Sequence, residues 1–349
     1  MGARRLSPIA TLPEPRGPLS EWLIERLGDR PRRADAPPAR ELLDQDVLGG
    51  DDLQLALYVA YELHYRSFES VDERWEWEPS LLSLRSRLED AFEAGLREPD
   101  GAHGEVAPEQ VEQRLRALVD GDDGPSVGAV IARRPVLEQL RELVVQRSAF
   151  QLKEADAHTW AIPRLRGRAK AALVEIQADE YGSGDPARIH QEMYRDTMLA
   201  LGLDPTYGAY LDHIPGVTLA TVNVVSMFGL HRRLRGAAVG HLAAYEMGSP
   251  AGSRRYANAL RRLGFGERAT AFFDEHVVAD SVHEAIATHD MAGGLAFSEP
   301  ELAGDILFGA RALALVERRF AQHVLGAWER GESSLRSPLG AAAPAQAVG

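Results

Sequence analysis

The amino-acid sequence predicts an all-α fold, and three observations lead to this prediction. Apolar side chains recur at three- and four-residue steps along most of the chain, which is the spacing of amphipathic helices. No segment shows the recurring alternation of apolar and polar residues that is typical of half-buried strands. Breaks rich in Gly and Asp, such as "DGAHGEVAPEQ" and "DGDDGPS", separate the helical segments.

The helical segments divide the chain into four parts. Residues 1–48 are rich in Pro and Arg and predict a partly ordered arm with one short helix at 19–28. Residues 49–130 predict an N-terminal helical extension, whose first long helix opens with an Asp N-cap. Residues 131–331 predict the main domain, a bundle of about seven core helices, and residues 332–349 predict a disordered Ala/Pro-rich tail. The helical segments of the main domain are expected at 134–160, 164–182, 185–202, 216–236, 236–248, 249–264, 266–291 and 300–330.

The composition excludes several classes of function. The formal net charge of −13 argues against a protein that binds nucleic acid by neutralising phosphates. The chain contains no cysteine, which excludes disulfides, thiolate nucleophiles and Cys-based zinc or iron–sulfur sites. No run of about 18 apolar residues occurs, and no apolar segment follows the N-terminal arginines. We therefore expect a cytoplasmic protein without a membrane or nucleic-acid partner.

Side chains that can ligate a metal recur at a few places in the apolar helical segments. In "DEHVVADSVHEAIATHDM" the positions i, i+4 and i+7 carry His, Asp and His, and these positions share one face of a helix. A Glu and a His ten residues apart flank "GSGDP", where Asp185 and Pro186 predict the N-cap and first residue of a new helix. Two further glutamates lie near the ends of the segments 134–160 and 236–248. The seven candidate ligands are Glu154, Glu180, His190, Glu246, His276, Asp280 and His283.

These residue types predict a pair of divalent cations. Ionised carboxylates without partners in a helical core would cost several kcal/mol each, whereas four carboxylates match the charge of two M²⁺ ions. Mixed carboxylate and imidazole ligands suit iron or manganese and disfavour copper. Any one of these residues alone is more often an exposed carboxylate or a core histidine than a ligand. The prediction of a metal site therefore depends on all seven candidate ligands occurring together.

The order of these residues resembles that of the haem-oxygenase-like diiron oxidases, also called iron-containing redox enzymes. The resemblance covers roughly residues 134–330, and "EIQADEYGSGDPARIH" looks like the second core helix of that family. It implies a haem-oxygenase-like helical bundle that binds two Fe(II) ions, or Mn²⁺ as the alternative, with O2 as co-substrate. The seven candidates would be the metal ligands, and all of them except Glu246 are expected to be catalytic. His158, four residues after Glu154, is a weaker candidate ligand.

The resemblance implies an O2-dependent oxidation of a small molecule, for which we expect an amino acid or amine and N-oxygenation, desaturation or oxidative C–C cleavage. Residues 216–234 are expected to form a tightly packed core helix, with lining of the substrate pocket as the alternative, and a homodimer is the candidate oligomer. Oxidative decarboxylation of a fatty acid is one alternative. A non-catalytic helical interaction protein with a structural metal site is another. We favour the oxidase because structural sites are closed, whereas seven ligands shared by two metals leave positions open for O2.

Overall fold

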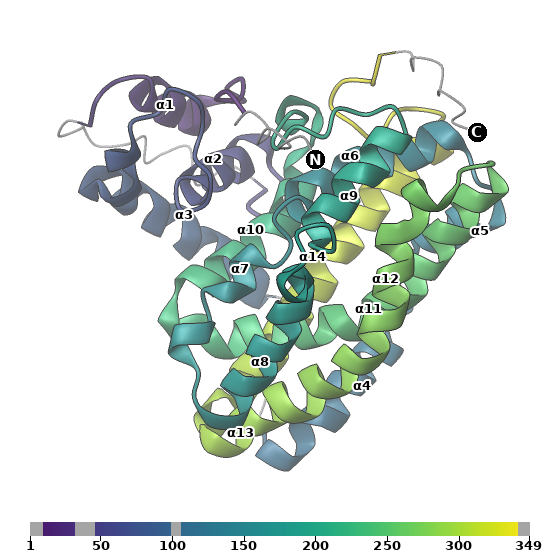
Figure 1. The fold of residues 1–349 in the computed structure, drawn as a ribbon. Helices are drawn as coiled ribbons and strands as arrows, with labels where there is room; N and C mark the ends of the chain where they lie inside the picture. The colour runs from purple at the N-terminus through teal and green to yellow at the C-terminus, as the bar shows by residue number, and fades with distance from the viewer. Residues whose placement is uncertain (1–9, 32–45, 99–105, 341–349) are drawn as a thin grey trace.

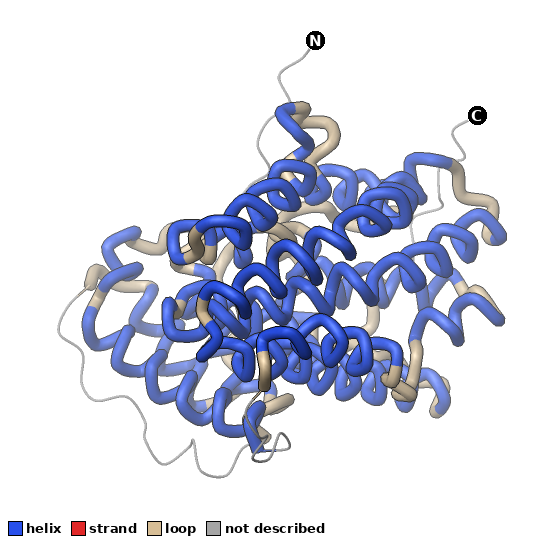
Figure 2. Tube along the Cα trace, turned by 90° about the horizontal axis from the view of Figure 1, so that it is seen from below, coloured by secondary structure: helices blue, strands red, loops and turns tan. Residues whose placement is uncertain are grey.

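The described part of the protein is entirely helical. A computed structural model describes residues 10–31, 46–98 and 106–340, and the side chains of 279–282 lie outside this description. Within these ranges every regular element is a helix and no strand occurs (Figures 1 and 2), so the all-α prediction is confirmed. In the same ranges, no helix combines the length and the apolar character needed to cross a bilayer.

The chain runs through helices of very different lengths. The α-helices are α1 (Pro18–Leu27), α2 (Asp51–Glu62), α3 (Pro79–Arg97), α4 (Val111–Asp120), α5 (Val127–Arg133), α6 (Leu137–Gln151), α7 (Asp156–Thr159), α8 (Gly167–Glu180), α9 (His190–Ala200), α10 (Gly216–Leu230), α11 (Arg235–Arg262), α12 (Glu267–Ala285), α13 (Gly294–Ser298) and α14 (Ala303–Glu329). A π-helical segment, η8 (Ile286–Gly293), joins α12 to α13. Short 3₁₀ turns are η1 (Glu73–Trp77), η3 (Pro108–Gln110), η4 (Ile162–Arg164), η5 (Gly182–Gly184), η6 (Leu211–His213), η7 (Arg232–Leu234) and η9 (Pro300–Leu302).

The bundle is built around α11. This helix packs along both α14 and α12, α9 packs on α12, and α8 packs on η8. In Figure 1, α14 (yellow) runs through the middle of the bundle, and α1 to α3 gather at one side. α10 joins the two parts because it contacts α2 on one side and α14 on the other.

The N-terminal extension shares the core of the main domain. Leu53, Leu55, Leu57 and Val59 point to different sides of α2 and are all fully buried, which is the pattern of a helix surrounded by protein. Buried residues from α1 to α14 form one continuous hydrophobic cluster. Residues 49–130 are therefore largely helical, as predicted, but they do not form a separate hydrophobic unit.

The two aspartates at the start of α2 cap other helices. The predicted Asp N-cap is wrong, because Gly50 occupies the N-cap position of α2. Asp52 accepts hydrogen bonds from the backbone N–H groups of Leu19 (3.0 Å) and Ser20 (2.7 Å) in the first turn of α1. Asp51 accepts from the N–H of Gly216 (2.5 Å), the first residue of α10. Both carboxylates thus satisfy helix N-termini that lack a cap of their own.

Three helix boundaries differ from the prediction. The segment 134–160 is broken, because α6 ends at Gln151 and a turn leads into α7. The segments 236–248 and 249–264 form one helix that continues through Pro250, since packing of α11 against α12 and α14 outweighs the hydrogen bond that proline removes. Residues 127–133, which follow the predicted break "DGDDGPS" and for which the sequence predicts no element, form α5.

The start of the predicted tail is held against the bundle. Glu142 Oε2 accepts hydrogen bonds from the backbone N–H (2.9 Å) and hydroxyl (2.8 Å) of Ser334, which is buried. The backbone N–H of Arg336 donates to the carbonyl of His213 (2.9 Å). The tail predicted as disordered from residue 332 is therefore anchored at Ser334 and Arg336, and residues 341–349 lie outside the described part.

The close approach of α11 and α14 requires glycine. A Cβ atom added to Gly240 would lie 1.7 Å from the carbonyl oxygen of Ile306, so any side chain forces the helices apart. We expect Gly240→Ala to lower the free energy of unfolding by about 2 kcal/mol or more. Gly248→Ala, in the same helix but with nothing within 4 Å, should raise it by about 0.5–1 kcal/mol. Urea denaturation of both variants checks this, and equal effects would contradict it.

Candidate metal centre

Six of the seven predicted ligands converge in the interior of the bundle. Glu154, Glu180, His190 and His276 each offer one ligand atom, and these atoms all lie within 4.8 Å of one another. Glu180, Glu246 and His283 form a second group that meets the same limit. Glu180 belongs to both groups. The seventh predicted ligand, Asp280, lies in α12, but its side chain is outside the described residues.

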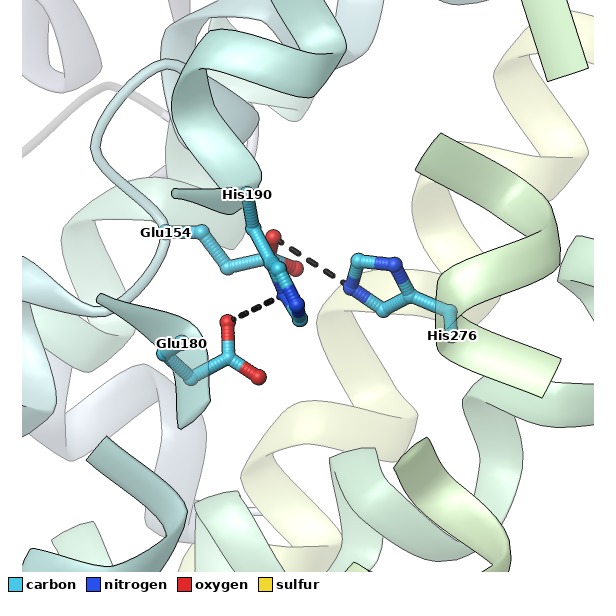
Figure 3. Close-up of side chains that lie close together, drawn as sticks. All are labelled: Glu154, Glu180, His190 and His276. Carbon is cyan, nitrogen blue, oxygen red and sulfur yellow. Dashed lines mark ion pairs between the residues drawn. The ribbon is translucent and has the colours of Figure 1, made fainter. Parts of the chain in front are cut away.

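Glu154 lies on a turn between two helices. The sequence places it near the end of a continuous helix, but α6 ends three residues earlier, and residues 152–155 form the turn before α7. The backbone N–H of Lys153 bonds to Phe150 O (2.9 Å), and that of Asp156 bonds to Lys153 O (3.0 Å). This turn directs the Glu154 side chain toward α8, α9 and α12 (Figure 3).

The "GSG" loop brings Glu180 and His190 together. Glu180 is the last residue of α8, and Gly182, Ser183 and Gly184 all have positive φ, which reverses the chain. A Cβ atom on Gly182 would lie 2.8 Å from the backbone N of Ile189, so the returning chain requires glycine there. His190 Nδ1 then lies 2.8 Å from Glu180 Oε2 (Figure 3).

The predicted start of the following helix is wrong, although the predicted convergence is confirmed. Asp185 accepts a hydrogen bond from the N–H of Ala187 (2.9 Å) in a turn, and α9 begins only at His190. Asp185 and Pro186 therefore end the loop and do not start the helix. Asp185 caps locally because its side chain bonds the N–H group two residues on.

The two histidines of α12 reach different groups. Seven residues of helix span about 10 Å along the axis, so His276 and His283 project from one face at two heights. His276 Nε2 lies 3.4 Å from Glu154 Oε2 in the first group (Figure 3). His283 Nδ1 lies 3.4 Å from Glu246 Oε2 in the second. Glu246 occupies the middle of α11, because this helix continues beyond its predicted end.

Hydrogen bonds outside the groups orient both α12 histidines. His276 Nδ1 lies 2.8 Å from the carbonyl oxygen of Phe272, which can only accept, so Nδ1 carries the proton and Nε2 presents a lone pair to the first group. His283 Nε2 lies 3.1 Å from Asp179 Oδ2, which leaves Nδ1 facing Glu246. Tyr245 donates to Glu154 Oε1 (3.3 Å). In metal sites, hydrogen bonds of this kind fix the orientation of the imidazole ring and of the carboxylate.

The cluster concentrates charge in a buried place. All six side chains are buried. Burial raises the pKa of Glu180, but the nearby His190, His276 and His283 lower it by more, so the carboxyl stays ionised. Burial also raises the pKa of Glu246, whose net shift is upward. Burial lowers the pKa of His283, but the neighbouring carboxylates of Glu246 and Asp179 outweigh this and raise it to about 9. Protons on imidazoles and divalent cations are thus alternative counter-charges for these carboxylates.

The residues fit a pair of hard or borderline cations. Glu180 Oε2, His190 Nδ1 and His283 Nδ1 are fully buried, yet none makes a hydrogen bond of normal geometry. Buried polar atoms normally have such a partner, so three exceptions within one cluster point to ligands held for a metal. The donor set contains only carboxylate oxygens and imidazole nitrogens, which suits iron or manganese.

A small cavity opens beside the cluster. Its volume is about 310 Å³, including its opening to solvent. Its lining residues are Phe150, Glu154, Ala155, His158, Gln177, Glu180, Leu242, Tyr245, Glu246, Ser249 and His276. None comes from 216–234, and α10 is a buried core helix, as expected for this segment. Its Asn223 instead donates to Gln54 O (2.8 Å), because α10 packs against α2.

His158, the weaker candidate ligand, pairs with another histidine. Its Nε2 lies 3.1 Å from Nδ1 of His241, and His158 belongs to neither ligand group. Burial lowers the pKa of His158 to about 4 and that of His241 well below its ordinary value, so both rings are neutral at pH 7. Sequence analysis missed His241, although its spacing of four residues from Tyr245 places both on one face of the helix.

This histidine pair makes the metal-free fold sensitive to acid. The pKa of His158 is lower in the folded than in the unfolded protein, so the unfolded state binds more protons below pH 6.5. The contribution of neutral His158 to the free energy of unfolding should be fully present above pH 6.5. It should fall by about 3 kcal/mol as the pH drops to 4. Urea denaturation at several pH values should show a shallower loss for His158→Asn. An unchanged slope, equal to that of the exposed-site control His289→Asn, would contradict this expectation.

Comparisons with known proteins identify the fold and the family of the chain. A crystal structure of a CADD-like protein of unknown function from Nostoc punctiforme PCC 73102 has a similar fold, with a TM-score of 0.50 and 16% sequence identity over 63% of this chain and 97% of that one. No curated protein matches the chain. A family model described as "Iron-containing redox enzyme" matches residues 141–318, which is just over half of the chain. The predicted haem-oxygenase-like fold is thereby confirmed, and the chain belongs to the iron-containing redox enzyme family.

Proposed function

We propose that this protein is an O2-activating non-haem diiron oxidase or oxygenase that acts on a small molecule. The observation that supports it most strongly is the place of Glu180, which belongs to both groups of potential ligands. A carboxylate has two oxygens and can bridge two cations, so one shared glutamate fits two neighbouring ions better than two unrelated sites. Asp280, which the sequence spacing predicts on the same face of α12, is the proposed seventh ligand.

The protein residues would bind and orient the two ions and keep bulk water away. Glu154, His190 and His276 would hold one ion, Glu246 and His283 the other, and Glu180 both. When bound, two iron(II) ions supply the electrons and the coordination positions that O2 chemistry needs. Asp179 would hold His283 in the tautomer that presents Nδ1, as Phe272 O does for Nε2 of His276.

The cavity lining favours an amino acid or amine as substrate. Only Phe150, Ala155 and Leu242 are apolar among the lining residues, whereas Gln177, Tyr245 and Ser249 are polar and are not proposed as ligands. A long fatty acid would need a long apolar channel, whereas the space beside the cluster is small and lined mostly by polar residues. N-oxygenation, desaturation and oxidative C–C cleavage are the proposed reaction types. A small-molecule substrate, a cytoplasmic location and a homodimer without nucleic-acid or membrane partners stay predictions.

The alternative proposal of an interaction protein with a structural metal site has weaker support. A structural zinc site is closed by four protein ligands around one ion. Here three carboxylates and three imidazoles are divided between two overlapping groups, both of which contribute residues to the cavity lining.

Metal loading tests the proposed function directly. We expect the purified protein, loaded with Fe(II) under anaerobic conditions, to bind about two iron atoms per chain. Admission of air should then produce a transient band in the visible spectrum, and free amino acids or amines should be screened for faster O2 consumption. Binding of one zinc ion per chain, with no response of the iron-loaded protein to O2, would favour the structural site.

Single substitutions should separate the two ions. Since His283 belongs only to the second group, His283→Ala should leave about one iron per chain. Glu180 belongs to both groups, so Glu180→Ala should lower the occupancy of both ions. Atomic absorption after gel filtration measures this, with the exposed His289→Ala as control. An iron content that is the same in His283→Ala as in the wild type would count against the assignment.

A further inference from the structure

The last turn of α2 and the residues that follow it contact two residues that are next to proposed metal ligands in the sequence. Glu62 is the last residue of α2, and Arg66 follows it by four residues. Glu62 contacts Lys153, which directly precedes Glu154. Arg66 contacts Gln191, which directly follows His190. Both contacts come from the N-terminal extension, outside the part of the chain that matches the family.

The first contact is an ion pair that is almost completely buried. Lys153 Nζ lies 2.7 Å from Glu62 Oε2, and the two side chains are 2% and 1% exposed. The hydroxyl of Tyr207 donates to the same carboxylate oxygen (2.7 Å). The ammonium group also lies 4.6 Å from the ring centre of Tyr58 and 4.3 Å from that of Tyr65. Carboxylate and aromatic faces together compensate the charge that burial removes from water.

This ion pair includes a residue of the turn 152–155, which lies between two helices and belongs to neither of them. Glu154 lies on the turn between α6 and α7, so the helical hydrogen-bond ladder does not fix its backbone. Lys153 extends toward α2, whereas Glu154 extends toward His276. Adjacent residues of one turn are therefore held by opposite sides of the bundle. A shift of Lys153 would carry Glu154 with it.

The second contact belongs to a chain of polar side chains. Arg66 Nη2 donates to Gln191 Oε1 (2.6 Å), and Gln191 Nε2 donates to Asp156 Oδ1 (3.2 Å). The guanidinium group of Arg66 lies 4.4 Å from the ring centre of Tyr207, the residue that also bonds Glu62. The start of α9, where His190 lies, is thereby linked to α2 and to the first residue of α7.

We propose that Glu62, Lys153 and Arg66 are positioning residues of the metal centre, through which the N-terminal extension sets the placement of Glu154 and His190. The proposal rests on the metal centre proposed above. The extension is then part of the working site, and the metal affinity of the first group depends on residues that lie behind its ligands. Residues that hydrogen-bond a ligand directly change metal affinity by about 10- to 100-fold, and contacts to the residue beside a ligand should act at the lower end of that range.

Titration of the metal-free, full-length protein with Co(II) tests this proposal, because the visible bands of Co(II) report both affinity and ligand geometry. We expect Glu62→Gln to weaken Co(II) binding at the first group by about tenfold and to change its visible bands. The matched control is Glu89→Gln, which removes another buried glutamate of the extension. Glu89 pairs with Arg85 (3.3 Å) and His231 (2.9 Å) and touches no neighbour of a ligand.

A double variant separates positioning from stability. Replacing both charges, as in Glu62→Gln with Lys153→Met, avoids leaving one buried charge unpaired and should recover most of the thermal stability. Because the directed contact is still missing, the weaker Co(II) binding should persist. Recovery of wild-type affinity together with the stability would show that the pair serves only folding and would overturn the proposal.

Arg66→Met provides a test that does not depend on the buried pair. Arg66 is exposed, so this variant should fold, and loss of one hydrogen bond should weaken Co(II) binding about fivefold. Arg97→Met is its control, since Arg97 also stacks on an aromatic ring, that of Phe308, but contacts no neighbour of a ligand. Equal Co(II) affinity in Glu62→Gln, Arg66→Met and the wild type would overturn the positioning proposal. If the wild-type protein binds no Co(II), that result would instead contradict the proposed metal centre itself.

Discussion

The structure depends on the neutralisation of charge inside the helical bundle. Three glutamates and three histidines meet in the interior, and Glu180 lies between the other members. An ionised carboxylate in such a place is unfavourable by several kcal/mol unless a cation or proton compensates it. The raised pKa of His283 and the upward shift of Glu246 are two consequences of this constraint. The proposed divalent cations would neutralise these carboxylates through ligand types that the cluster already contains.

Several residues of the cluster lie where regular helices end, begin or are interrupted by a turn. Glu154 lies on a turn, Glu180 ends a helix, and His190 begins one. The loop between the last two needs three consecutive residues with positive φ, including the non-glycine Ser183. Helix ends place side chains in directions that a continuous helix cannot provide. The cost of these breaks is offset by the continuous core that α2, α10, α11 and α14 build around them.

Much of the site could be predicted from the sequence because its signals are local. The spacing of His276 and His283 defines one face of a helix, and the "GSGDP" insert marks the reversal that joins Glu180 to His190. The true start of α9 and the continuity of α11 through Pro250 depend on tertiary packing, which local propensities do not contain. The pair of Glu62 and Lys153 was not predicted, since 91 residues separate two side chains that ordinarily indicate a solvated surface.

The central claim is that two metal ions share Glu180, and crystals grown with Fe(II) under anaerobic conditions test it most directly. Diffraction data collected on both sides of the iron absorption edge would locate each ion independently of the protein atoms. We expect two anomalous peaks about 3.5–4 Å apart, one on each side of the Glu180 carboxylate. A single peak, or peaks that leave Glu180 without a metal contact, would contradict the account.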